Sequence, residues 1–240
     1  MRLNRNKIIF AWILLLTGMS GFLNVGAVME FLIPVSHVTG NLTQTAICLA
    51  KGDGSRLVQY LLMFLAYLLG ATVSGLIFKQ KILSFKENPY GLFLISFGII
   101  LLIQSHISCS TRIVMFVLSF VMGGQNGMFI FYRGLLVRST HMTGYITDAG
   151  TALATILKPE HVKDRKLALR NFLFYIFSMV IFVIGGFASA LTHIYGKAKA
   201  GILTLTVSGI GYLILGLFVV VYRYKLRHRL IGDEVSIKED

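Results

Sequence analysis

Long apolar runs recur along the chain and predict membrane-spanning helices. Six are long enough, or nearly so, to cross a bilayer: residues 8–29, 57–78, 90–106, 113–132, 171–192 and 201–222. A helix needs about 20 apolar residues to cross roughly 30 Å of hydrocarbon. Two further runs, 42–50 and 144–157, are too short, because a helix of about 14 residues rises only about 21 Å. We therefore predict an all-α fold, a polytopic membrane helix bundle of about six spanning helices plus two short broken or re-entrant helices.

The same polar phrase accompanies each short run. The first phrase extends from Ser36 to Gln44 and reads Ser-His-Val-Thr-Gly-Asn-Leu-Thr-Gln. The second extends from Thr140 to Asp148 and reads Thr-His-Met-Thr-Gly-Tyr-Ile-Thr-Asp. His, Thr, Gly and Thr occupy identical places in both phrases. The repetition predicts that the chain consists of two related halves.

The similarity extends beyond the phrases. Upstream, Gly-Phe-Leu-Asn at 21–24 parallels Gly-Gly-Gln-Asn at 123–126; downstream, 69–76 parallel 184–191 in their small residues. The predicted halves are about 8–106 and 113–222, within a single membrane domain 1–240. Residues 223–240 form a tail that is first basic and then acidic, which we expect to be cytoplasmic.

Two topologies fit this order of segments. If the short segments turn back, each half has three spans and the halves are inverted. If they cross, each half has four spans and the halves are parallel. The basic residues at 2–7, 79–86, 158–170 and 223–229 all lie on one side in the six-span arrangement. Because basic loops face the cytoplasm, this arrangement is favoured, with both termini cytoplasmic.

Composition agrees with an integral membrane protein. The chain is 55% hydrophobic, only 14% charged, and carries a net charge of +13. The basic residues lie beside apolar runs, as in membrane topology, so we expect the lipid bilayer as partner and no nucleic acid. The first apolar run continues past Gly21 without a small-x-small cleavage site, which predicts a retained helix rather than a signal peptide. Small-residue faces such as Ser119, Gly123 and Gly127 predict close helix packing and would permit a homodimer.

The phrases also carry the candidate chemistry. Gly40 and Gly144 offer points where the chain can break, and Thr39 and Thr143 are suited to capping the following helix. A helix that begins inside the membrane leaves N–H groups unpaired and has a partial positive charge at its start. Discontinuous helices in corresponding places of two halves indicate a transport site. The alternative is a purely structural helix break.

Further polar side chains near the phrases could contact a solute. The threonines recur every four residues and form a hydroxyl stripe, although such hydroxyls often bond to their own helix. The histidines titrate near neutral pH, and Asp148 replaces Gln44 as an acid inside an apolar segment. Glu30 is expected to be a solvated boundary residue. The candidate substrate-binding residues are Asn24, His37, Thr39, Gly40, Asn41, Thr43, Gln125, Asn126, His141, Thr143, Gly144, Thr147 and Asp148.

Motifs typical of enzymes are missing from the sequence. It contains no phosphate-binding loop, no Gly-x-Ser-x-Gly and no His-Glu-x-x-His. Two histidines without carboxylates make a poor metal site, and Cys48 and Cys109 form no metal-ligand pattern. We expect no enzymatic activity, no cofactor and no bound metal.

The phrases resemble those of the YoaK family of bacterial membrane proteins. The segments 21–24, 37–41, 124–127 and above all 138–148, which contains Thr-His-Met-Thr-Gly-x-x-Thr-Asp, carry this resemblance. Asn24 departs from the acidic residue of the family pattern. The resemblance implies a domain of unknown function over about 8–222 and a multi-pass protein of the bacterial inner membrane.

Three functional hypotheses follow. The first is a small secondary transporter or permease for a small polar or anionic solute, with its site at the interface of the two repeats. The second is a channel-like pore with paired half-helices, since such elements also build selective pores. The third is a non-transporting membrane scaffold in which the phrases only support folding.

Overall fold

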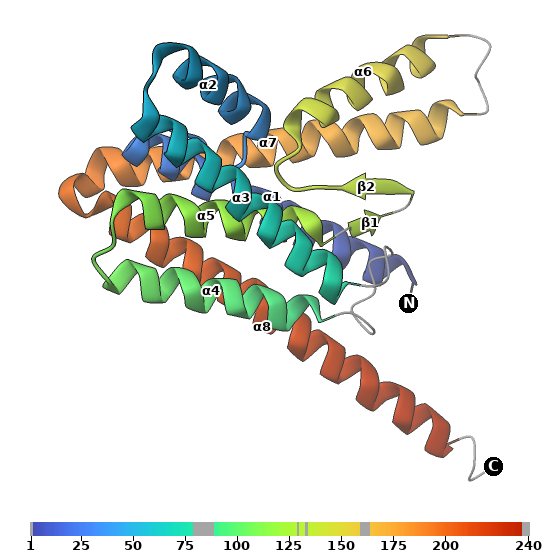
Figure 1. Cartoon of the computed structure of the whole chain (residues 1–240). Helices are drawn as coiled ribbons and strands as arrows, with labels where there is room; N and C mark the ends of the chain where they lie inside the picture. The colour runs from blue at the N-terminus through green and yellow to red at the C-terminus, as the bar shows by residue number, and fades with distance from the viewer. Residues whose placement is uncertain (1, 79–88, 129, 133, 159–163, 237–240) are drawn as a thin grey trace.

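The computed structural model describes residues 2–78, 89–128, 130–132, 134–158 and 164–236. Within them lie α1 (Arg2–Phe31), α2 (Val38–Lys51), α3 (Gly54–Ile77), α4 (Tyr90–His106), α5 (Thr111–Gly127), β1 (Ile130–Tyr132), β2 (Leu135–Val137), α6 (Met142–Leu157), α7 (Arg165–Gly196), a 3₁₀ turn (Lys197–Lys199) and α8 (Ala200–Ser236). The predicted helix bundle is confirmed (Figure 1). The predicted cytoplasmic placement of the basic loop 79–86 and of linker residues 159–163 lies outside the described residues.

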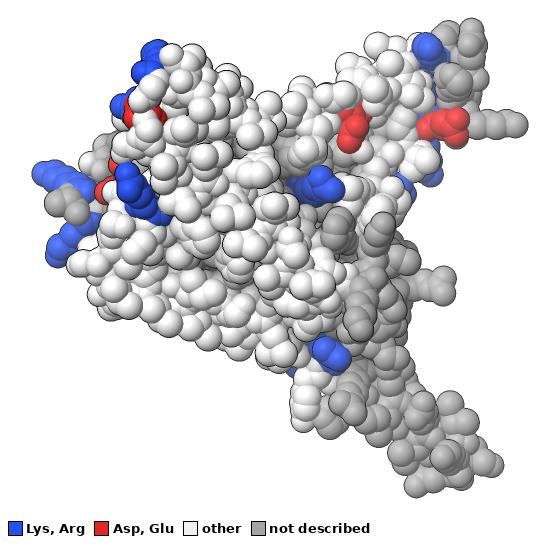
Figure 2. Space-filling view, viewed as in Figure 1, with Lys and Arg blue, Asp and Glu red and all other residues white. Residues whose placement is uncertain are grey.

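Four helices of the described part are long and apolar enough to cross a membrane, namely Lys7–Phe31 of α1, α3, α7 and Ala200–Lys225 of α8. The helices α4 and α5 have 17 residues each, and rise about 26 Å, slightly less than the hydrocarbon thickness. Large apolar side chains on the outer surfaces, such as Leu65, Val183 and Ile214, are exposed. Most of the face in Figure 2 is uncharged. The chain is therefore a multi-pass membrane protein.

The predicted span 113–132 is wrong at its C-terminal end. The helix α5 ends at Gly127, and Ile130–Tyr132 form strand β1, which pairs antiparallel with β2. Gly134 has a φ of 85°, a conformation that glycine adopts without strain, and it lies in the turn between the strands. Hydropathy alone does not separate a short apolar strand from the end of an apolar helix.

The long helices pack in three pairs: α1 with α7, α3 with α5, and α4 with α8. Figure 1 shows α1 and α5 running in opposite directions. The short helix α2 packs on α3, and α6 packs on α7. In the sequence, each short helix therefore precedes the long helix that supports it.

Glycines allow the closest helix crossings. A Cβ added at Gly21 of α1 would overlap the Phe182 carbonyl oxygen of α7, and one added at Gly123 of α5 would overlap the Tyr67 carbonyl oxygen of α3. Gly123 and its neighbours thus pack α5 against α3 within one chain. This intramolecular packing uses the small-residue face that could otherwise have supported a homodimer.

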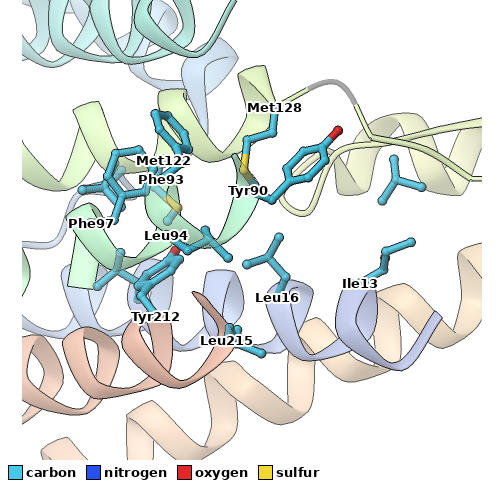
Figure 3. Packing of buried hydrophobic residues seen from close by; sticks show 14 of the residues in the cluster. Ile13, Leu16, Tyr90, Phe93, Leu94, Phe97, Met122, Met128, Tyr212 and Leu215 are labelled. Carbon is cyan, nitrogen blue, oxygen red and sulfur yellow. The ribbon is translucent and has the colours of Figure 1, made fainter. Parts of the chain in front are cut away.

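Aromatic and aliphatic side chains fill the interior between α1, α4, α5 and α8 (Figure 3). On α4, Phe93 and Phe97 contact each other with ring centroids 4.5 Å apart, and Tyr90 stacks on Phe78 at 4.6 Å. From α8, Tyr212 is fully buried in the same region. This packing brings the Tyr212 hydroxyl into the bundle interior, where a polar cluster lies.

Candidate functional site

The first phrase is anchored to the side of α1. After α1 ends at Phe31, Leu32 adopts a φ of 59° and the chain turns back. The Ser36 backbone N and hydroxyl both donate to Asn24 Oδ1, at 3.1 and 2.9 Å. Because Asn24 lies seven residues before the end of α1, α2 begins about 10 Å back along that helix.

The second phrase is anchored in the same way to α5. The β1–β2 hairpin leads away from α5 and returns, so that Thr140 N donates to Asn126 Oδ1 at 3.3 Å. Asn126 Nδ2 donates to the Thr140 hydroxyl at 2.5 Å. In the predicted repeat, Asn126 matches Asn24 and Thr140 matches Ser36. One asparagine in each half therefore holds the residue that precedes the phrase histidine.

A second contact also occupies matching positions. Asn41 Nδ2 donates to the Pro34 carbonyl at 2.9 Å, and Arg138 N donates to the Tyr145 hydroxyl at 3.0 Å. In both cases a buried side chain in the first turn of the short helix fixes the backbone seven residues earlier. Asn41 is therefore a structural anchor.

The helix caps differ from the prediction. His37 and His141 occupy the N-cap positions of α2 and α6, and neither helix start has a side-chain cap hydrogen bond. Thr39 and Thr143, predicted as caps, lie inside the first turn because each helix begins one residue earlier than these threonines.

The phrase glycines make room for the histidine rings. A Cβ at Gly40 would lie 2.7 Å from His37 Nδ1, and one at Gly144 would overlap the His141 ring. Both histidine side chains are otherwise exposed. Each ring therefore covers the start of its helix, at the edge of the solvent-accessible surface.

The threonine stripe is satisfied within its own helices. Thr43 donates to the Thr39 carbonyl at 3.1 Å, and Thr147 donates to the Thr143 carbonyl at 3.0 Å. These side chains remain exposed. Their hydroxyl protons are used by the backbone, so the oxygens are left to accept hydrogen bonds from a ligand or water.

Asp148 faces a polar groove between α6 and α7. This open cavity of about 410 Å³, here called the Asp148 groove, is lined by Asp148, Thr151 and Thr155 of α6, by Asp164 just before α7, and by Asn171 and Tyr175 of α7. A cavity of about 10 Å³ lies between α2 and α3, but its α2 lining, which includes Asn41 and Thr45, does not match the α6 lining of the Asp148 groove.

Gln125 is the centre of a buried polar cluster. Its Nε2 lies 2.6 Å from the Ser139 hydroxyl, 2.7 Å from the Ser20 hydroxyl and 3.2 Å from the Leu16 carbonyl. The Tyr212 hydroxyl donates to its Oε1. The Gln125 cluster, defined as these side chains, joins α1, α5 and α8 to the segment before α6. Gln125 is one of the predicted site residues, whereas Ser20, Ser139 and Tyr212 were not predicted, because no local pattern distinguishes them.

Tyr67 has contacts near the beginnings of both short helices. Its hydroxyl accepts a hydrogen bond from Asn126 Nδ2 at 2.9 Å, and its ring lines the small cavity beside Val38 and Asn41. Among the described residues no hydrogen bond joins the two phrases directly. In Figure 2 the surface is hollowed between the part that carries α2 and the part that carries α6.

A further cavity lies where α1 and α4 end and α5 and α8 begin. It measures about 370 Å³, and its lining includes Glu30, Gln104, His106 and Thr204. Glu30 Oε2 lies 3.6 Å from His193 Nε2. Glu30 is exposed, as expected of a boundary residue, but it also lies against His193, which is distant in the sequence. We call this space the Glu30 cavity.

The comparison with known families gives one match. Residues 12–218 match the family described as "Protein of unknown function (DUF1275)". The chain belongs to this family. No curated protein matches the chain, and no solved structure matches it. The expected domain of unknown function is confirmed by this match, whereas the YoaK name stays a prediction.

Proposed function

We propose that the protein is a small secondary transporter or permease for a small polar or anionic solute, placed in the bacterial inner membrane with both termini cytoplasmic. The observation that carries this proposal is the pair of matching anchors, Asn24 with Ser36 and Asn126 with Thr140. Each anchor holds the start of a short helix beside a long helix rather than beyond the end of that long helix. Broken helices in corresponding places of two halves are typical of secondary transporters.

The helix pairs support an inverted relation between the halves. Consider an exchange of α1 with α5, α2 with α6 and α3 with α7. It converts the α1–α7 pair into the α5–α3 pair, and the α2–α3 pair into the α6–α7 pair. The α4–α8 pair maps onto itself: Gly91 lies against Gly216, and Gly98 against Gly209. Since α1 and α5 run in opposite directions, we infer that the two halves are related by an axis in the membrane plane.

The starts of α2 and α6 suit polar or anionic groups. Neither helix start has a side-chain cap hydrogen bond, so the positive end of each helix dipole is not offset by such a bond and favours a polar or anionic group. We place the solute between these starts, next to Tyr67 and Thr140. The exposed His37, His141, Thr39 and Thr143 would then contact it as it passes.

A transporter is favoured over an open pore. The Glu30 cavity and the Asp148 groove share no lining residue, and the Gln125 cluster fills the interior of the bundle with paired hydrogen bonds. Alternating access requires such a barrier, which opens on one side at a time. A channel-like pore would need a continuous path across the bundle, and a scaffold would not need the exposed polar side chains of the phrases.

The test is uptake by the purified full chain in liposomes. Radiolabelled glycine, acetate, nitrate, phosphate and glycerol serve as probes, with protein-free liposomes as control. A transporter gives saturable uptake of at least one probe, which Asp148→Asn or Thr143→Val reduces at least tenfold. Linear, non-saturating flux would support the pore instead. Absence of uptake for every probe, with the variants altering only stability, would favour the scaffold.

A further inference from the structure

The Glu30 cavity contains buried polar groups that have no partner within the described structure. Both side-chain atoms of Gln104 and the hydroxyl of Thr204 lack a hydrogen-bond partner. Gln104 is 7% exposed and Thr204 is 5% exposed. Burying an unpaired amide or hydroxyl costs free energy, so groups of this kind normally face water or a ligand. Both residues line the cavity, which is large enough to hold water or a ligand.

The cavity lining is acidic. Among the described residues that line it, Glu30 is the one acidic side chain, and none is Lys or Arg. His106 and Cys109 line it as well. The Glu30 carboxylate is 42% exposed, whereas the side chain of its neighbour His193 is 6% exposed. A single carboxylate balances the charge of one monovalent cation.

Small residues keep the carboxylate and the hydroxyl accessible. A Cβ at Gly201 of α8 would lie 3.0 Å from Glu30 Cδ, and one at Gly26 of α1 would overlap Thr204. The carboxylate, the Gln104 carbonyl oxygen and the Thr204 hydroxyl therefore supply three oxygens to one space. Oxygen ligands of this type suit hard cations.

We propose that the Glu30 cavity binds a small monovalent metal cation, the coupling ion of the transporter, through Glu30, Gln104 and Thr204. The identification as coupling ion rests on the proposed transport function, whereas cation binding itself does not. This site lies apart from both phrases, so a polar or anionic solute and the cation occupy different places.

The test is thermal unfolding of the purified full chain in detergent. NaCl, KCl and LiCl are each compared with N-methylglucamine chloride at equal ionic strength and at pH 8.0. We expect one cation to raise Tm by about 3–6 °C at saturation, because a ligand that binds only the folded state stabilises it.

Variants assign the effect to named groups. Glu30→Gln should abolish the cation-dependent rise in Tm, and Thr204→Val should weaken the apparent Kd at least fivefold. Thr206→Val is the matched control, since Thr206 lies on the same helix and donates to its own backbone at Ile202. If Glu30→Gln fails to fold, a weaker apparent Kd in Thr204→Val beside an unchanged Kd in Thr206→Val still assigns the effect to the cavity.

Two results would overturn the proposal. One is a native chain whose Tm no alkali cation raises above the N-methylglucamine value. The other is a cation-dependent rise that persists undiminished in folded Glu30→Gln. Cation binding without solute uptake in liposomes would support the cation site and contradict the transport function. Uptake without cation binding would support the transport function and contradict the cation site.

Discussion

The two halves of the molecule share a scaffold but differ in their polar chemistry. In each half an asparagine holds the start of a short helix against a long one, and a glycine allows the long helices to cross closely. The first half has Leu23 and Gln44 where the second has Gln125 and Asp148. The asparagine anchors and the glycine crossings are therefore duplicated, whereas the buried amide of Gln125 and the acid of Asp148 have no counterpart at the matching positions of the first half.

The largest expected effect is on the duplicated helix crossings. Gly21→Val and Gly123→Val each insert a side chain into the backbone of the opposing helix. We expect each to lower the free energy of unfolding by about 3 kcal/mol or more, measured by thermal unfolding in detergent. Gly150→Ala is the control, because no other atom lies within 4 Å of its added Cβ. If only one of the two valine variants were destabilised, the crossings would not be equivalent.

A somewhat smaller effect is expected at Gln125, whose matching residue in the first half is the apolar Leu23. Gln125→Leu removes one hydrogen bond from each of the buried hydroxyls of Ser20, Ser139 and Tyr212. We expect a loss of about 2–3 kcal/mol, from the desolvation cost of unpaired polar groups. Leu23→Met, at the matching position of the first half, should cost less than about 1.5 kcal/mol. Equal losses in chemical or thermal unfolding would contradict the assigned role of Gln125.

The two asparagine anchors should differ in strength. Asn126 forms hydrogen bonds with Thr140, Tyr67 and the Met122 carbonyl and is buried, whereas within the described part of the chain Asn24 forms hydrogen bonds with Ser36 and is half-buried. We expect Asn126→Ala to cost about 2 kcal/mol and Asn24→Ala about 1 kcal/mol in the same unfolding assay. A larger cost at Asn24 would mean that the first anchor has contacts beyond those described.

The smallest effect on stability is expected at the exposed acid. Asp148→Asn should change the free energy of unfolding by less than about 0.5 kcal/mol, because Asp148 is exposed. Its effect on liposome uptake should nevertheless be at least tenfold, while Gln44→Ala in the first half should leave uptake within twofold. Equal effects on uptake at both positions would remove the functional asymmetry between the halves.

The sequence predicted the parts of this architecture that are local. Apolar runs located the long helices, and the repeated phrase located α2 and α6, because both signals depend on neighbouring residues. The strand Ile130–Tyr132 was predicted as helix because its residues are apolar in either structure. The caps at His37 and His141 were missed because the helix starts are defined by backbone geometry rather than by residue preference.

The polar partners could not be predicted, because they come from distant segments. Tyr212 and Gln125 are 87 residues apart in sequence, and Ser20 and Gln125 are 105 residues apart. Glu30 and His193 come together only when α1 and α7 pack in the same direction. Tertiary contacts, rather than local pattern, create both the Gln125 cluster and the Glu30 cavity.

The inverted relation of the halves can be tested by the positions of the two short-helix ends. Lys51→Cys and Leu157→Cys place one thiol each at the C-terminal ends of α2 and α6, in a chain that lacks Cys48 and Cys109. Intact cells are treated with a membrane-impermeant maleimide, and then opened vesicles are treated in the same way. If the halves are inverted, Lys51→Cys reacts from outside and Leu157→Cys only from the cytoplasmic face. If both react from the same face, the halves are parallel.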